Sequence, residues 1–219
     1  MADASKIIPH ILQWEGGLSR NPADTASKNP APCTYNGKTG YHTNKGVTYT
    51  TFTSLAKSLN YEPSCENFFT MPNDIFLKIF KTGYWNGFKL DDYKSQKIAN
   101  VIVSWAWASG AYGAYKQLKK FFEKEYNTKL TGTYNENINT IRDLFNKETL
   151  KDETAVYNKL IKQYKAFYIS LNQPTFIKGW LNRLADLTQF NLAFDAVKKN
   201  PFKSIAILAL TAYAIKKAL

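Results

Sequence analysis

Apolar residues recur at three- and four-residue spacing along most of this 219-residue chain, and this periodicity constrains the fold more than any other feature. Such spacing places the apolar side chains on one face of a helix. Strand signals are few and are confined to about 33–48, where Asn36-Gly37 is a good hairpin turn. The pattern therefore predicts a mainly α fold with a small β element. Helices are predicted at about 51–59, 72–80, 98–105, 114–125, 134–147, 150–171 and 176–190.

The composition predicts a folded chain with a basic surface. Hydrophobic residues make up 44% of the chain and aromatic residues 15%, which is enough to bury a sizeable core. The 29 Lys and Arg exceed the 17 Asp and Glu, and the resulting net charge of +12 attracts polyanions. Nucleic acid and the bacterial cell wall are both polyanionic, so the net charge alone does not distinguish between these two partners. We expect no nucleic acid, because the basic stretch 116–124 is explained equally well by a solvated helix face.

The first helical stripe ends in a carboxyl group that two glycines follow. Ile8, Ile11, Leu12 and Glu15 share one helix face, so we expect the Glu15 carboxyl to lie toward the core. Burial would raise the pKa of this carboxyl, as a general acid working near neutral pH requires. A structural glutamate that caps the helix or pairs at its end explains the same pattern. The segment by itself leaves both interpretations open.

The next fifty residues add a second carboxylate, Asp24, and the run Thr43-Asn44-Lys45-Gly46-Val47-Thr48. Together with Glu15-Gly16-Gly17, this arrangement resembles the catalytic segment of glycoside hydrolase family 108, the phage-type N-acetylmuramidases. The resemblance implies that Glu15 is the catalytic acid, Asp24 the second carboxylate, and Thr43 the threonine of a Thr-x-x-Gly element. The family usually carries Pro-Gly-Gly directly after the aspartate. This chain instead has an insertion over about 25–41.

The resemblance extends to about residue 190 through three further motifs: Gly83-Tyr84-Trp85, the stretch from Trp105 to Gly110, and Gly179-Trp180-Leu181-Asn182-Arg183. It implies a lysozyme-like helical fold with a β hairpin near the catalytic glutamate. Residues 1–91 would form the catalytic half and 92–190 a helical half of the peptidoglycan-binding type, packed as one globule with the first. Residues 191–219 would be a basic, apolar helical tail. The family's aspartate before its Trp-Ala-Ser stretch is replaced by Ser104 or Trp105, so no role for that carboxylate is transferred.

The resemblance implies an endolysin-like peptidoglycan hydrolase that cleaves the β-1,4 bond between N-acetylmuramic acid and N-acetylglucosamine. Glu15 would protonate the glycosidic oxygen, Asp24 would orient a water or stabilise the transition state, and Thr43 could position that water. A lytic transglycosylase, which needs only the acid, and a non-catalytic peptidoglycan-binding protein remain open. Aromatic faces pack on sugar rings, so four further side chains are candidates for substrate binding: Tyr41, Tyr84, Trp85 and Trp180. Each of them by itself is more often a core residue.

The cysteines and histidines give no sign of a metal or cofactor. His10, His42, Cys33 and Cys65 lack the paired spacing of a zinc site, so we expect neither a metal nor another cofactor. Two isolated cysteines in a chain of this length are more often free thiols than a disulfide. A bridge could nevertheless tie the insertion to the following helix pair.

The two ends of the chain bear on localisation. The N-terminal residues lack the pattern of a signal peptide, so we expect synthesis in the host cytoplasm and action on the periplasmic wall after release. The uncharged run 204–215 has lysines on both sides and is too short to span a bilayer. A final helix packed on the core and a tail that touches a membrane surface both fit this run.

Overall fold

The computed structural model describes residues 1–199, which divide into two compact units. Among the described residues, the helical unit comprises Met1–His10 and residues 84–199, and the small unit comprises Ile11–Gly83. The roles expected for residues 1–91 and 92–190 stay predictions. The apolar run 204–215, expected to pack on the core or touch a membrane, lies outside the described residues.

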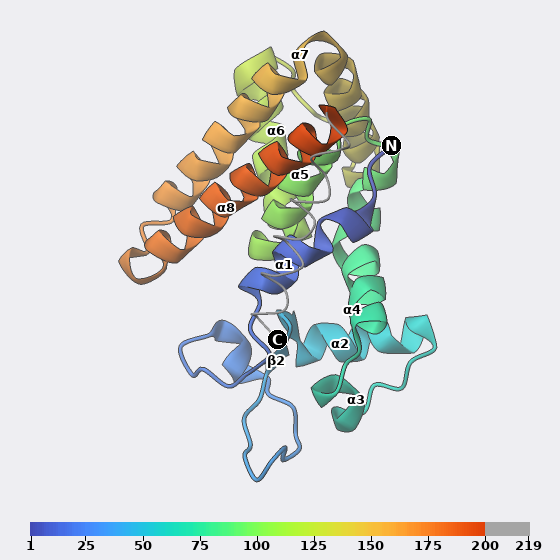
Figure 1. Ribbon diagram of the computed structural model, residues 1–219, viewed down its shortest axis with the longest axis vertical. Helices are drawn as coiled ribbons and strands as arrows, with labels where there is room; N and C mark the ends of the chain where they lie inside the picture. Colours follow the sequence, from blue (N-terminus) through green and yellow to red (C-terminus); the bar gives the residue numbers. More distant parts are fainter. Residues whose placement is uncertain (200–219) are drawn as a thin grey trace. The chain divides into compact units, whose positions relative to one another are not determined.

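Long helices dominate the described part of the helical unit, and Figure 1 shows α7 and α8 running side by side. The helix α5 contacts α6, α7 and α8. Short 3-10 turns η1 (Ala4–Lys6), η5 (Asn86–Phe88) and η6 (Leu90–Asp92) accompany them. The long helices are α5 (Gln96–Ser109), α6 (Ala111–Tyr126), α7 (Tyr134–Ser170) and α8 (Pro174–Lys199).

The core of the helical unit is built around α5. Every residue from Lys97 to Ala106 is buried, as expected for a helix that is largely apolar on all sides. Aromatic rings fill the neighbouring space. The Phe145 ring lies 4.7 Å from the Phe122 ring between centroids, and the Trp105 ring stacks on Tyr164 at 4.3 Å. Close packing of large rings thus fixes the positions of these helices.

The ends of these helices follow local sequence signals. A capping box joins Thr133 and Glu136 at the start of α7, and Gly110 separates α5 from α6 with a φ of 75°. The two helices predicted at 134–147 and 150–171 form one element with a break at Asp152, whose φ of −155° is not helical. The Asp152 carboxylate accepts from the Ala155 N–H, which starts the second segment.

The small unit combines a three-stranded antiparallel sheet with short helices. The sheet order is β1 (Leu18–Ser19), β2 (Thr43–Asn44), β3 (Val47–Thr48). The expectation of a mainly α fold with a small β element is confirmed, although β1 was not predicted. The helical elements are η2 (Thr25–Lys28), α2 (Tyr49–Ala56), η3 (Lys57–Leu59), α3 (Cys65–Phe69) and α4 (Asn73–Phe80). Two elements cross between the units, namely α1 (Ile8–Trp14) and the π turn η4 (Lys81–Trp85).

Two tight turns shape the β region of the small unit. The predicted turn at Asn36-Gly37 is present: both residues have positive φ, and the flanking Tyr35 and Lys38 bridge each other. Lys45 and Gly46, with φ of 50° and 78°, make the same kind of turn between β2 and β3. Positive φ at both central residues matches the twist of a hairpin.

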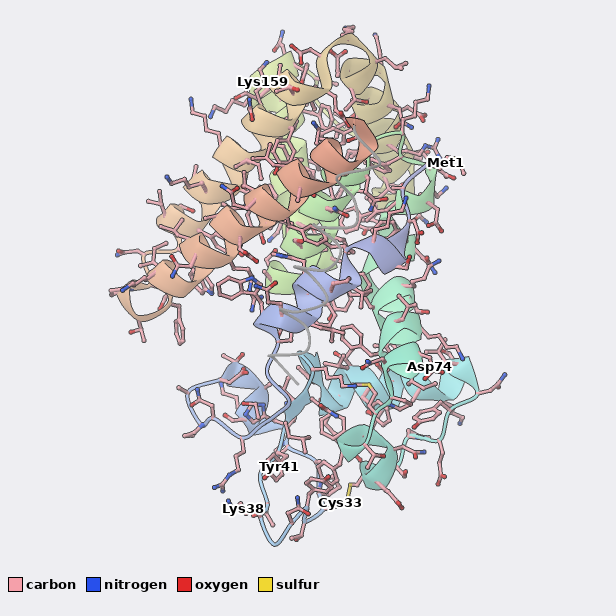
Figure 2. The ribbon with its side chains drawn as sticks, viewed as in Figure 1. Met1, Cys33, Lys38, Tyr41, Asp74 and Lys159 are labelled. Carbon is pink, nitrogen blue, oxygen red and sulfur yellow. A yellow bond between two sulfur atoms is a disulfide. The ribbon has the colours of Figure 1, made fainter. Side chains whose placement is uncertain are left out.

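The insertion over 25–41 is covalently tied to α3. A disulfide joins Cys33 to Cys65, with the two Cα atoms 6.3 Å apart. The preference for free thiols was therefore wrong. It rested on the rule that two isolated cysteines in a chain of this length are more often free thiols, whereas folding brings the insertion against the start of α3. Figure 2 shows Cys33, Lys38 and Tyr41 together on this loop.

Candidate functional site

Glu15 lies at the junction between α1 and the sheet of the small unit. Its backbone N–H still donates to the Ile11 carbonyl at 3.1 Å, so it completes the last turn of the helix. Its side chain is half-buried, and the exposed Gly16 and Gly17 lead directly into β1. Glu15 therefore lies at the end of a helix and next to a strand, and it is less buried than the helical stripe predicted.

The pairing of β1 with β2 sets the register between the Glu15 junction and Thr43. Ser19 lies opposite Thr43, and Leu18 lies opposite Asn44. The Lys45 N–H extends this ladder by donating to the Gly17 carbonyl at 3.4 Å. The sheet thus joins the residues after the expected acid to the expected threonine.

The turn between β2 and β3 is anchored by its own side chains. The buried Asn44 amide donates to the Phe68 and Phe69 carbonyls at 2.6 and 3.2 Å. The Lys45 ammonium donates to the Met71 carbonyl at 2.8 Å, and its partial burial lowers the pKa of this group. These bonds satisfy carbonyls at and beyond the end of α3. The central residues of the Thr-Asn-Lys-Gly run therefore have a structural role, which sequence reasoning did not assign.

Asp24 is exposed and caps the 3-10 turn η2. Its Oδ1 accepts from the Ala26 N–H at 2.9 Å, and its own backbone N–H donates to the Asn21 carbonyl. This capping bond accounts for an aspartate here on local grounds. Among the described residues, the hydrogen bond of this carboxylate is made by Oδ1, and the catalytic role of Asp24 stays a prediction.

His42 connects the Asp24 turn to Thr43, and sequence reasoning considered it only as a metal ligand. Its ring is completely buried. Nδ1 lies 2.8 Å from the Thr43 hydroxyl, and Nε2 lies 3.1 Å from the Asn21 carbonyl, the same carbonyl that accepts from Asp24. The signal that could have identified His42 is its place directly before Thr43 at the entrance to a strand. There, a polar ring that faces inward needs partners.

Tyr41 lies at the end of the insertion and packs within an aromatic cluster. Its ring centroid is 6.2 Å from Tyr35 and 5.9 Å from Phe69. Figure 2 shows Tyr41 on the loop that also carries Cys33. The ring is half-buried, so the cluster supports the loop while part of Tyr41 faces solvent.

The three remaining aromatic candidates belong to the helical unit. Trp85 is completely buried, and its indole N–H donates to Asp91 at 2.8 Å, so it serves the core in this structure. Tyr84 is half-buried against Trp107 at 4.8 Å. Trp180, also half-buried, stacks on Tyr168 at 5.3 Å. Tyr84 and Trp180 therefore each keep an exposed part, and their role in substrate binding stays a prediction.

The end of the Gly-Trp-Leu-Asn-Arg run faces a buried histidine. His10 Nδ1 lies 3.2 Å from the Asp186 carboxylate, and the His10 ring packs on Phe190 at 5.3 Å. Burial lowers the pKa of His10 to about 4. The Asp186 carboxylate opposes this shift, and the positive charge of Arg183 adds to it. Arg183 thus lies within the structural contacts of the helical unit.

Neither a metal-binding cluster nor a membrane-spanning helix is found among the described residues. Over 1–199, no group of three or more His, Cys, Asp or Glu side chains is placed to hold a metal ion. No helix in this range is both long and apolar enough to cross a bilayer.

Comparison with known proteins gives a family and a fold. Residues 8–110 match the family described as Glycosyl hydrolase 108, a span that contains Glu15, Asp24 and Thr43. A solved structure of Brucella abortus SagA is similar, with a TM-score of 0.57 and 22% sequence identity over 87% of this chain and 94% of that one. At this identity the likeness concerns the fold alone. The comparison with curated proteins finds no match.

Proposed function

We propose that the protein acts as an N-acetylmuramidase. The chain belongs to the glycosyl hydrolase 108 family through residues 8–110, and it is therefore a glycoside hydrolase of peptidoglycan. The bond cleaved is the β-1,4 linkage between N-acetylmuramic acid and N-acetylglucosamine. Water adds across this bond, and the muramic acid residue becomes a new reducing end. We further propose that the enzyme is a phage endolysin, made in the host cytoplasm and acting on the wall after release.

The observation that carries the proposal is the register of the small sheet. The ladder from Gly17–Lys45 to Ser19–Thr43 joins the segment after Glu15 to the strand that bears Thr43. A carboxylic acid and a hydroxyl group are thereby held on one rigid scaffold, as general acid catalysis with a positioned water requires. The half-buried state of both side chains leaves each accessible to a substrate.

In the proposed reaction, protonated Glu15 donates its proton to the glycosidic oxygen as the bond breaks. Positive charge develops on the sugar, and the Asp24 carboxylate stabilises it or orients the attacking water. Thr43 accepts a hydrogen bond from that water and so fixes its direction. The net charge of +12 favours encounter with the polyanionic wall.

A lytic transglycosylase is the second candidate, and the role of Asp24 favours it. The capping bond to the Ala26 N–H gives this carboxylate a structural reason to be present without any catalytic one. A transglycosylase needs the Glu15 acid, but it uses a hydroxyl of the substrate in place of water. It would leave anhydro-muramic ends.

The first experiment digests purified peptidoglycan with the wild-type enzyme and Glu15→Gln, and identifies the new sugar ends by mass spectrometry. Reducing muramic acid ends from the wild type, and a loss of at least about 100-fold in the variant, are expected. Glu62→Gln is the matched control because Glu62 is exposed on a loop of the same unit. Anhydro-muramic ends would identify the activity as that of a lytic transglycosylase and not of a muramidase. Full activity of Glu15→Gln would show that Glu15 is not the catalytic acid.

Asp24→Asn then separates chemistry from capping. Asparagine caps a helix as well as aspartate, so the substitution removes the charge and keeps the bond to the Ala26 N–H. For the muramidase, we expect a loss of about 10-fold or more in kcat with unchanged stability. Wild-type rates for Asp24→Asn would take this carboxylate out of the mechanism.

A further inference from the structure

We propose that His42 is a positioning residue that holds the Thr43 hydroxyl in the orientation needed to accept a hydrogen bond from the attacking water. The inference rests on the proposed muramidase function and concerns only residues of the small unit. His42 lies outside the Thr-x-x-Gly run on which the resemblance rests.

The neutral His42 ring carries its hydrogen at Nε2. This nitrogen lies 3.1 Å from the Asn21 carbonyl oxygen, which can only accept a hydrogen bond. Nε2 must therefore carry the hydrogen. In a neutral ring, Nδ1 is then an acceptor with a lone pair in the ring plane.

The acceptor at Nδ1 decides the direction of the hydrogen bond between Thr43 and His42. The Thr43 hydroxyl lies 2.8 Å away, so the hydroxyl donates its single hydrogen to His42. Among the described residues, this ring nitrogen is the one hydrogen-bond partner of the Thr43 hydroxyl. The two lone pairs of Thr43 Oγ1 are thereby directed away from the ring, where they can only accept.

Burial and backbone hydrogen bonds hold His42 in place. The His42 ring is 0% exposed, its backbone N–H donates to the Ser19 carbonyl, and its own carbonyl accepts from the Tyr49 N–H. The ring therefore has a single orientation, and the hydroxyl rotor of Thr43 has one low-energy setting. A water that donates to Thr43 would have its own lone pairs oriented for attack before substrate arrives, which lowers the entropy cost of the reaction.

The arrangement also relates the two predicted residues that follow Glu15. The Asn21 carbonyl accepts from both His42 Nε2 and the Asp24 backbone N–H, so one carbonyl fixes the ring and the start of the Asp24 turn. A purely structural role would need only this Nε2 bond. A role in positioning Thr43 needs the Nδ1 bond.

Two substitutions separate these bonds. His42→Asn places an acceptor near the position of Nδ1 and loses the Nε2 donor, whereas His42→Gln places a donor near Nε2 and loses the Nδ1 acceptor. If His42 positions Thr43, His42→Asn keeps kcat within about threefold, and His42→Gln loses about tenfold in kcat with KM unchanged. Equal losses in both variants, or a greater loss in His42→Asn, would overturn the proposal.

The tautomer can be measured without any activity. Long-range proton–nitrogen NMR spectra of the folded wild-type protein at neutral pH should show His42 protonated at Nε2 alone. Protonation at Nδ1, alone or together with Nε2, would overturn the proposal even if a variant failed to fold. In a Thr43→Val background, His42→Gln should have no further effect on kcat, since the hydroxyl it orients is gone. A further tenfold loss in that background would assign the ring another role.

The Glu15→Gln variant distinguishes the two levels of inference. If Glu15→Gln is inactive while His42→Gln matches the wild type, the positioning role alone fails. If Glu15→Gln is active, the proposed acid fails, and the Nε2 tautomer still reports whether His42 orients Thr43.

Discussion

The helical unit and the small unit are held in shape by different kinds of contact. In the helical unit, one buried helix, α5, is surrounded by long helices and aromatic rings. The small unit has an apolar core around Phe52, Phe68 and Phe76, but none of the helices wholly within it exceeds eight residues and its strands have two residues each. Helices this short are unstable by themselves, so specific bonds must hold them.

In the small unit those bonds come from polar side chains and a disulfide. Asn44 and Lys45 bond to backbone carbonyls at and beyond the end of α3, and Cys33 is linked to Cys65. The comparison teaches that apolar packing supplies the stability of one unit, whereas directional bonds supply the geometry of the other. The proposed site, which must place Glu15 relative to Thr43, benefits from the second kind.

The largest effect is expected from removing a ring in the helical unit. Phe145→Ala deletes a completely buried ring that packs on Phe121 and Phe122, and it should lower the free energy of unfolding by about 3–5 kcal/mol. Urea unfolding followed by tryptophan fluorescence measures this, because four of the five tryptophans lie in the helical unit. Phe176→Ala is the control, since that ring is 44% exposed. Equal losses in both variants would contradict the role given to apolar packing.

The disulfide is expected to matter nearly as much, but only to the small unit. Replacing Cys33 and Cys65 by serine should destabilise that unit by about 3–4 kcal/mol, because the bridge limits the freedom of the unfolded chain. Hydrogen exchange read by mass spectrometry should show faster exchange in peptides from 11–83. Peptides from α5 serve as an internal control. Faster exchange of equal size in both units would show that the bridge does not act locally.

His10 is a buried titratable side chain of the helical unit, and it makes the stability of that unit depend on pH. Its pKa is about 4 in the folded protein and 6.5 in an unfolded chain, so the unfolded state binds more protons between these values. Stability should therefore fall as pH decreases from about 6.5 to about 4, by up to about 3 kcal/mol. Urea unfolding at several pH values measures the slope. His10→Asn should flatten it, and an unchanged slope in that variant would point to other groups.

The smallest effect on stability is expected from a single polar anchor. Asn44→Ala leaves the Phe68 and Phe69 carbonyls without their amide donor and should destabilise the small unit by about 1–3 kcal/mol. The exposed Asn29→Ala should change stability by less than about 0.5 kcal/mol. Hydrogen exchange in β2 and α3 measures both. If the two variants behave alike, the anchor does not hold the turn.

Helix positions and turn types were largely accessible from local sequence. The periodicity of 72–80 and 98–105 predicts α4 and α5, because the side chains that repeat on one face are the ones that become buried. Asn36-Gly37 predicts its turn because those residues tolerate positive φ. The break near 150 was also visible, although the structure reduces it to one non-helical residue, Asp152.

The sequence alone also singled out Glu15, Asp24 and Thr43, through spacing and a motif that are local properties of the chain. Only the tertiary structure decided what each of them contacts. The pairing of β1 with β2, the Cys33–Cys65 bridge and the contact of His42 with Asn21 join residues 21 to 32 positions apart. Such pairings depend on which segments meet when the core forms, and a two-residue strand carries too little pattern to reveal its partner.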